Sequence, residues 1–121
     1  MRQECIIVGM LISMSAYALG PYDGDWTGMG APVGECKYPV GIHMNIVNNI
    51  ISGTVNGSSS EGVPFTANIV PGVTIGSDGV ASIFIGESRR APATIRFSGD
   101  QFQGTVQSTC ANRPFSGTRT K

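Results

Sequence analysis

The chain has 121 residues, of which 13% are charged, and its 8 lysines and arginines balance its 8 aspartates and glutamates. A net charge of zero without a basic tract excludes the electrostatic surface on which nucleic-acid binding depends, so we expect no nucleic-acid partner. Glycine occupies 17 positions, about twice its ordinary share of ~7%, which is typical of a chain with many turns.

The first residues have the pattern of a secretory signal peptide. Arg2 precedes a short apolar run, and small residues stand at the two positions that signal peptidase reads, Ala16 and Ala18. The run is too short for a transmembrane helix, which needs about 20 apolar residues. We therefore predict a signal peptide over 1–18 and a single β-barrel domain over 19–121. The protein would be periplasmic or secreted, and it would not be an integral membrane protein after removal of the signal.

Cysteine usage agrees with export. Cleavage after residue 18 would remove Cys5 and leave Cys36 and Cys110 as the remaining pair. In an oxidising compartment, such a pair favours one disulfide. Because neither cysteine belongs to a Cys-x-x-Cys motif, we expect the bridge to be structural. It would also place the beginning and the end of the domain close together.

Beyond the signal, apolar and polar residues alternate with a period of two, which predicts strands, and no stretch keeps a helical period. The expected strands, about eight in number, cover residues 26–29, 40–47, 50–56, 63–69, 80–85, 93–98, 102–110 and 115–119.

Turn signals separate these strands. Asn48-Asn49 predicts a tight hairpin, because asparagine tolerates a positive φ. Ser77-Asp78-Gly79 and Gly99-Asp100 predict further turns, and the stretch from Gly57 to Gly62 is typical of an exposed loop. Pro64 indicates the start of a strand or an edge strand.

The fold class that follows is all-β, a small antiparallel up-and-down barrel of about eight strands, with a β-sandwich as the alternative. Glycines within strands, at Gly53, Gly104 and Gly117, favour the barrel because tight coiling needs positions without a side chain. The alternation that starts at Phe102 points Cys110 toward the interior.

Few residues suggest a chemical site. His43 lies on the polar face of its strand, and no hydrolase, zinc-protease or phosphate-loop motif is present, so we expect no enzyme, no catalytic residue and no cofactor. Asp23-Gly24-Asp25 lacks the later acidic ligands of a calcium loop, so we expect no metal. Arg89-Arg90 precedes a proline in an expected loop and could contact a partner. Asn56-Gly57-Ser58 fits the glycosylation acceptor pattern, for a host that modifies exported asparagines.

Trp26 is the single tryptophan of the chain and stands at the start of the first expected strand. We expect its indole to close one end of the barrel. Arg119, on the last strand, would cap the indole through a cation–π contact worth roughly 1 kcal/mol. This hypothesis follows from the expected proximity of the two ends of the domain.

Several short motifs together give the exported part a distinctive outline: Asp23-Gly24-Asp25-Trp26-Thr27-Gly28, Cys36 before a strand, Gly79-Val80, Phe102-x-Gly104 and Cys110…Gly117-Thr118-Arg119. In this outline the chain resembles small exported Gram-negative bacterial proteins of unknown function, which combine a signal peptide with a tryptophan opening and a single-disulfide β domain. Gly24-x-Trp26 with a late Arg119 is similar to lipocalin and avidin-like barrels, in which tryptophan and arginine close the barrel base. The segment from Trp26-Thr27 to Cys36-Lys37 resembles the start of periplasmic protease-inhibitor barrels, although those close a small loop with a nearby second cysteine.

These observations predict a non-catalytic binding or inhibitory β-barrel module, whose partner is a small ligand or an envelope or host protein. The alternative is a structural or surface-associated protein of the envelope, and an enzyme comes third. Small residues on the inward faces, among them Ala67 and Ser108, fit either an internal cavity or close packing.

Overall fold

In a computed structural model, residues 20–59, 61–86 and 90–121 are described, and the predicted signal peptide lies outside them. Within these ranges no helix is long and apolar enough to cross a membrane. The described chain forms strands: β1 (Gly24–Gly30), β2 (Val40–Val47), β3 (Ile50–Ser58), β4 (Pro64–Asn68), β5 (Val73–Thr74), β6 (Val80–Ile85), β7 (Ala91–Ser98), β8 (Gln101–Gln107) and β9 (Asn112–Arg119).

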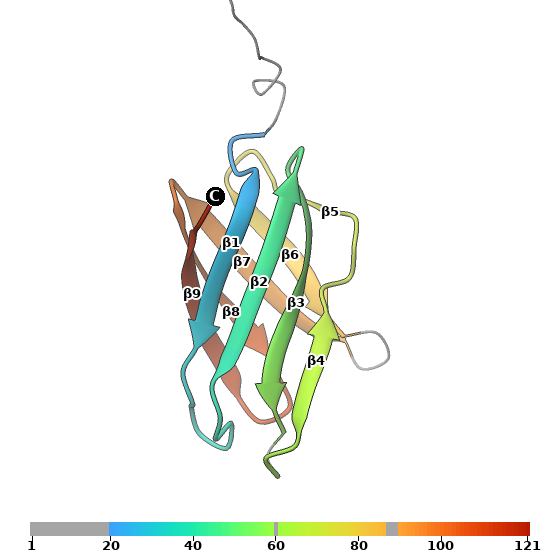
Figure 1. Cartoon of the computed structure of the whole chain (residues 1–121), viewed down its shortest axis with the longest axis vertical. Coiled ribbons are helices and arrows are strands. Elements are labelled where there is room, and N and C mark those ends of the chain that lie inside the picture. The colour runs from blue at the N-terminus through green and yellow to red at the C-terminus, as the bar shows by residue number, and fades with distance from the viewer. Residues whose placement is uncertain (1–19, 60, 87–89) are drawn as a thin grey trace, which may run out of the picture.

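All of these strands belong to one antiparallel sheet, in the order β4-β3-β2-β1-β9-β8-β7-β6, with the short β5 paired to β3. Most neighbours along the chain are neighbours in the sheet, and β9 returns to lie beside β1. The sheet curls into a half-barrel (Figure 1). The all-β prediction is therefore confirmed, and the strand order has the up-and-down character expected of a small barrel.

The two edges of the curled sheet meet at one point. Ile69, just after β4, forms an isolated antiparallel bridge with Ile85 of β6. The amide of Val70 donates to the carbonyl of Phe84 at 2.9 Å, and the amide of Gly86 donates to the carbonyl of Asn68 at 2.8 Å. This short junction ties the edges together beside the β6–β7 connection.

The core fills the concave face of the sheet, as the period of two requires. In β2, for example, Ile42, Met44 and Ile46 are buried, whereas His43 and Asn45 between them are exposed. The largest fully buried side chains are Trp26, Met44, Ile46, Ile51, Ile83 and Ile95.

Glycine permits the closest approach of strands in this core. Gly117 of β9 pairs with Gly28 of β1, and a Cβ atom on Gly117 would collide with the backbone carbonyl of Thr27. No side chain fits at this contact, which agrees with the expectation that a tightly coiled sheet needs glycine within its strands.

The local turn chemistry is also as predicted. Asn48 and Asn49 have φ values of 53° and 64°, so both central residues of the β2–β3 hairpin adopt the left-handed conformation of a type I′ turn. Gly99, with a φ of 62°, turns the chain between β7 and β8.

The expected strand over 102–110 is wrong at its C-terminal end. β8 stops at Gln107, and Cys110 lies in the loop that follows, not on an inward strand face. The Ser108 hydroxyl donates to the carbonyl of Ala111 at 2.7 Å and bends the chain there. The bend allows β9 to begin at Asn112, earlier than the expected residue 115.

Candidate functional site

The half-barrel has two unlike ends (Figure 1). At one end, here called the Trp end, residues 20–23 and the C-terminus lie beside the β2–β3 and β7–β8 turns. At the other, the disulfide end, the β1–β2, β3–β4 and β8–β9 loops come together. The β6–β7 connection borders the same end through Gly86 and Ala91.

Trp26 fills the Trp end and is 0% exposed. Its ring meets Phe97 edge-on at 5.0 Å between centroids and Phe102 at 6.0 Å, a favoured geometry for aromatic pairs. The indole Nε1–H donates to the carbonyl of Tyr22 at 2.8 Å, so the polar atom of the ring is satisfied. The indole and its aromatic neighbours thus fill this part of the core.

Arg119 lies over Trp26, with its guanidinium carbon 4.9 Å from the ring centroid. Its Nε donates to Asp100 at 2.8 Å, and its Nη1 donates to the carbonyls of Pro21 and Asp23 at 3.0 Å each. The side chain therefore ties the N-terminal segment to the β7–β8 turn above the indole. The stabilising effect expected of this pair stays a prediction.

The Asp23-Gly24-Asp25 segment serves the neighbouring hairpin. The two carboxylate oxygens of Asp23 accept hydrogen bonds from the amides of Asn48 and Asn49, at 2.6 and 2.9 Å. Asp25 accepts one from the side chain of Asn45 at 2.7 Å. Among the described residues, no group of three His, Cys, Asp or Glu side chains is placed to hold a metal ion.

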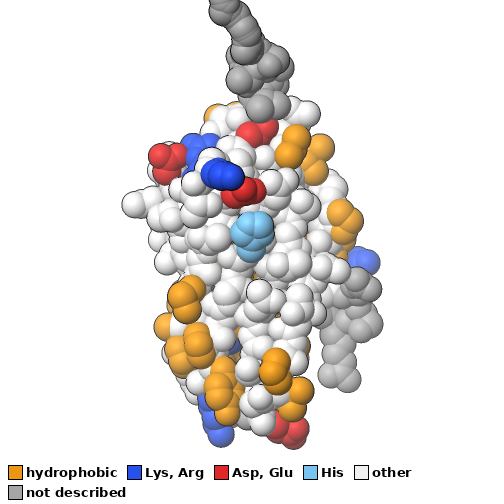
Figure 2. All heavy atoms as spheres, viewed as in Figure 1, with side chains coloured by type: hydrophobic (Ala, Val, Ile, Leu, Met, Phe, Trp, Pro, Cys, Tyr) orange, Lys and Arg blue, Asp and Glu red, His pale blue; other side chains and the backbone are white. Residues whose placement is uncertain are grey.

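The other residues singled out in the sequence lie apart from these clusters. His43 is exposed on the outer face of β2, near the centre of the view in Figure 2. Its neighbours across the sheet are Thr27 and Thr54. Arg90 is exposed, whereas Arg89 lies outside the described residues, so the expected partner contact of this pair stays a prediction.

The predicted disulfide is confirmed at the opposite end. Cys36 and Cys110 are bonded, with their Cα atoms 5.2 Å apart, and Cys36 is buried. The bond joins the β1–β2 loop to the β8–β9 loop. The hydroxyl of Ser108 lies 3.5 Å from the sulfur of Cys36 and 3.3 Å from that of Cys110, so it packs directly against the bridge.

A cavity of about 410 Å³ opens beside this disulfide, between the loops and the inner face of the sheet. Its volume falls within the range of about 300–1,000 Å³ that is usual for ligand pockets. Most of its lining is apolar and comes from strands on both halves of the sheet: Val40, Val55, Phe65, Ala67, Ile85 and Val106. The charged rim residues Glu35 and Lys37 are exposed.

The disulfide end also gathers exposed apolar side chains. Figure 2 shows such side chains toward the disulfide end of the molecule. In the loops and strands that border the cavity, Val63 is 58% exposed and Phe65 is 42% exposed. Their exposure follows from the position of β4 at the edge of the sheet, where few residues cover it.

One buried cationic side chain lines the cavity and was not predicted as a site residue. Arg113 of β9 is 5% exposed, and it is the one charged residue that is buried within the described chain. Its Nη2 donates to the carbonyls of Ala31 at 3.0 Å and Tyr38 at 2.7 Å, with a longer contact of 3.5 Å to Gly30. Its Nε is buried without a hydrogen-bond partner.

The sequence held a signal for Arg113. In β9 the inward face runs through Arg113 and Phe115 to Gly117, so counting back two residues from Phe115 places the arginine inside. Pro114 concealed this signal, because proline argues against a central strand. The proline is tolerated because β9 pairs with β1 only from Ser116 onward. At Pro114, β9 is paired with β8 alone.

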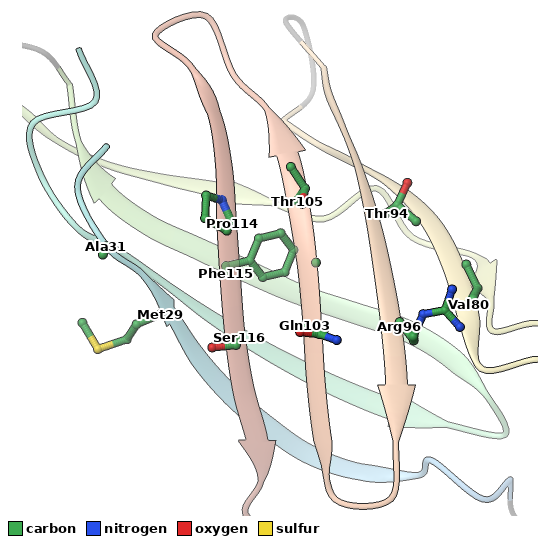
Figure 3. Close-up of a pocket in the computed structure, with 11 residues that line it drawn as sticks. Met29, Ala31, Val80, Thr94, Arg96, Gln103, Thr105, Pro114, Phe115 and Ser116 are labelled. Atoms are coloured by element: carbon green, nitrogen blue, oxygen red, sulfur yellow. The ribbon is translucent and has the colours of Figure 1, made fainter. Parts of the chain in front are cut away.

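A second hollow, of about 630 Å³, lies on the outer face of the sheet (Figure 3). It crosses β7, β8 and β9, with Met29 at one side and Val80 at the other. The polar side chains that line it, such as Arg96 and Gln103, are exposed to solvent. Because these polar groups remain accessible to solvent, this hollow is a weaker candidate for a binding site than the cavity beside the disulfide.

Comparison with known protein families, with curated proteins and with solved structures returned no match to this chain. The resemblances drawn from the sequence motifs therefore stay predictions, and the candidate site is defined by its geometry alone.

Proposed function

We propose that the protein is a non-catalytic binding module that takes a small apolar ligand into the cavity at the disulfide end. The observation that carries this proposal is the cavity itself, about 410 Å³ in volume and with a mostly apolar lining surface. Burial of apolar ligand surface in such a site contributes roughly 25 cal/mol per Å². Exposed apolar residues beside the opening, such as Val63 and Phe65, support it as the entrance.

Two of the loops around the cavity are held in place, which favours binding without a large ordering cost. The disulfide fixes the β1–β2 loop against the β8–β9 loop. Within the first of these loops, Val33 and Cys36 exchange two main-chain hydrogen bonds of 2.9 Å each. A preformed rim of this kind is typical of binding sites that change little when the ligand enters.

The proposed place of action is outside the cytoplasm, in the periplasm or the extracellular medium. A disulfide between Cys36 and Cys110 is compatible with an oxidising compartment, because cytosolic thiols are kept reduced. The test is fractionation of cells that express the full chain, combined with mass spectrometry of the N-terminus. Intact chain in the cytoplasm with both thiols free would contradict the proposal.

Ligand binding can be tested with N-phenylnaphthylamine, a neutral dye whose fluorescence rises in apolar surroundings. We expect saturable binding to the protein and its loss in the variant Ala67→Phe, since Ala67 lines the cavity and a phenyl group would fill it. The matched control is Thr66→Phe, because Thr66 is the neighbouring residue on the same strand and faces solvent.

Three outcomes separate the possibilities. Saturable binding that Ala67→Phe abolishes and Thr66→Phe retains supports the cavity as the site. Equal loss in both variants, or equal retention, would place the dye elsewhere. The absence of any saturable binding to the unmodified protein would overturn the proposal.

A further inference from the structure

The cavity contains a buried positive charge without a carboxylate partner among the described residues. Arg113 is buried, and among the described residues it forms no ion pair with a carboxylate. Arg119 makes a useful contrast, since it is paired with Asp100 at 2.6 Å at the Trp end of the half-barrel. A cation that is removed from water is costly unless an opposite charge compensates it.

The present partners of Arg113 supply only part of that compensation. They are main-chain carbonyls of the β1–β2 region, to which Nη2 donates. A neutral donor would satisfy carbonyl groups equally well, so anchoring this loop does not by itself require a full positive charge. Desolvation lowers the pKa of Arg113 from its ordinary value, which agrees with an uncompensated cation. The unpartnered Nε is a second sign of incomplete satisfaction.

We infer that the ligand of this cavity is an amphipathic anion, with an aliphatic or aromatic body and one carboxylate that pairs with Arg113. The inference rests on the proposed function and specifies its ligand class. The aliphatic wall formed by Val55, Ile85 and Val106 would cover the body of the ligand, and the guanidinium would receive its head group. A charged guanidinium suits this task because hydrogen bonds between a cation and a carboxylate are shorter and stronger than those between neutral groups.

Among the described residues, the other charges that line the cavity do not supply the missing anion. Glu35 and Lys37 both line its rim, are exposed, and cancel each other formally. Glu35 is not within ion-pair distance of Arg113. The described part of the rim therefore carries no net charge, and one buried cation lies inside it.

The first experiment compares ligands of equal chain length on the unmodified protein. Decanoate, decanol and decylammonium compete with bound N-phenylnaphthylamine at neutral pH and low salt. We expect decanoate to displace the dye at a concentration roughly tenfold or more below that of decylammonium, because a hydrogen bond to a charged partner typically contributes that much. Equal or stronger displacement by decylammonium would overturn the inference.

The second experiment changes the cation. In Arg113→Gln we expect the decanoate-to-decanol affinity ratio to fall roughly ten- to a hundredfold, while decanol binding changes little. Arg113→Lys keeps the charge and should preserve most of the ratio. Arg96→Gln removes the same charge from the exposed outer face and should leave the ratio unchanged.

These measurements also distinguish failure of the anion inference from failure of the binding proposal. If decanol and the dye bind but the ratio is the same in Arg113→Gln as in the unmodified protein, the anion inference fails and the binding proposal stands. If neither neutral compound binds, the binding proposal fails first. Should Arg113→Gln not fold, the comparison of decanoate with decylammonium still decides the matter on the unmodified protein.

Discussion

Removal of the Cys36–Cys110 disulfide should lower the free energy of unfolding by about 4.5 kcal/mol. The cysteines are 74 positions apart, so the bond closes a long loop in the unfolded chain. The chain-entropy relation gives about 4.5 kcal/mol for a loop of this length at room temperature. Because small domains are stable by only about 5–15 kcal/mol, this single bond decides whether much of the population stays folded.

The folded structure gives little reason to reduce this value. Without the bond, the Val33–Cys36 hydrogen bonds and the contact from Ser108 to Ala111 would still hold each loop locally. The native state would therefore change little, and most of the effect would come from the greater freedom of the unfolded chain. The same reasoning predicts a larger urea m-value without the bond, because the unfolded chain then exposes more surface.

The assay is urea unfolding of Cys36→Ser/Cys110→Ser in a Cys5→Ser background, so that no third thiol can exchange with the bridge. The reference is Cys5→Ser alone, measured with and without reductant. Reduction of the reference should reproduce the stability of the double substitution, and reductant should not affect the latter. A loss below about 1 kcal/mol, with an unchanged m-value, would refute the reasoning from chain entropy.

Three further predictions concern the Trp end and the closest strand contact. Arg119→Ala should lower the free energy of unfolding by about 1–3 kcal/mol, since it removes a cation–π contact and charged hydrogen bonds. It should also shift the fluorescence of Trp26 to longer wavelength. Unchanged emission and thermal stability would mean that the pair does not close this end. Gly117→Ala should lower the free energy of unfolding in urea by about 1–3 kcal/mol, because its methyl group would collide with the Thr27 carbonyl. A stability equal to that of the parent protein would contradict the packing described. Asp23→Ala should lower the free energy of unfolding by about 1–2 kcal/mol, because it removes the hydrogen bonds to the β2–β3 turn. Calcium should leave the Tm of the parent protein unchanged, and a rise in Tm with calcium would instead indicate a metal site.

Strand positions were predictable wherever the signal was local. The segments 40–47 and 80–85 have the bounds expected from their alternation, and the Asn48-Asn49 turn has the expected conformation. In each case the information lies in a few consecutive residues, namely the period of two and the tolerance of asparagine for a positive φ. The strand expected to run to Cys110 ends at Gln107 instead, because alternation alone does not show where a serine side chain bends the backbone.

The candidate site was less accessible to such reasoning. Its apolar wall combines strands far apart in the chain, such as β3 and β8, and nothing near Val55 indicates that Val106 will face the same space. The role of Arg113 was missed for a related reason. Its burial depends on the β1–β2 loop, whose carbonyls accept hydrogen bonds from its guanidinium and which the disulfide joins to the β8–β9 loop.

The amino-acid sequence by itself determined the all-β character, most of the strands and their turns, and the pairing of the two cysteines that follow the predicted signal. Only the tertiary structure decided that the disulfide end is open and that a buried cation lines the opening. The physical reason is that alternation and turn preference act between neighbours in the chain. A cavity depends instead on which strand ends meet and on what space their side chains leave unfilled.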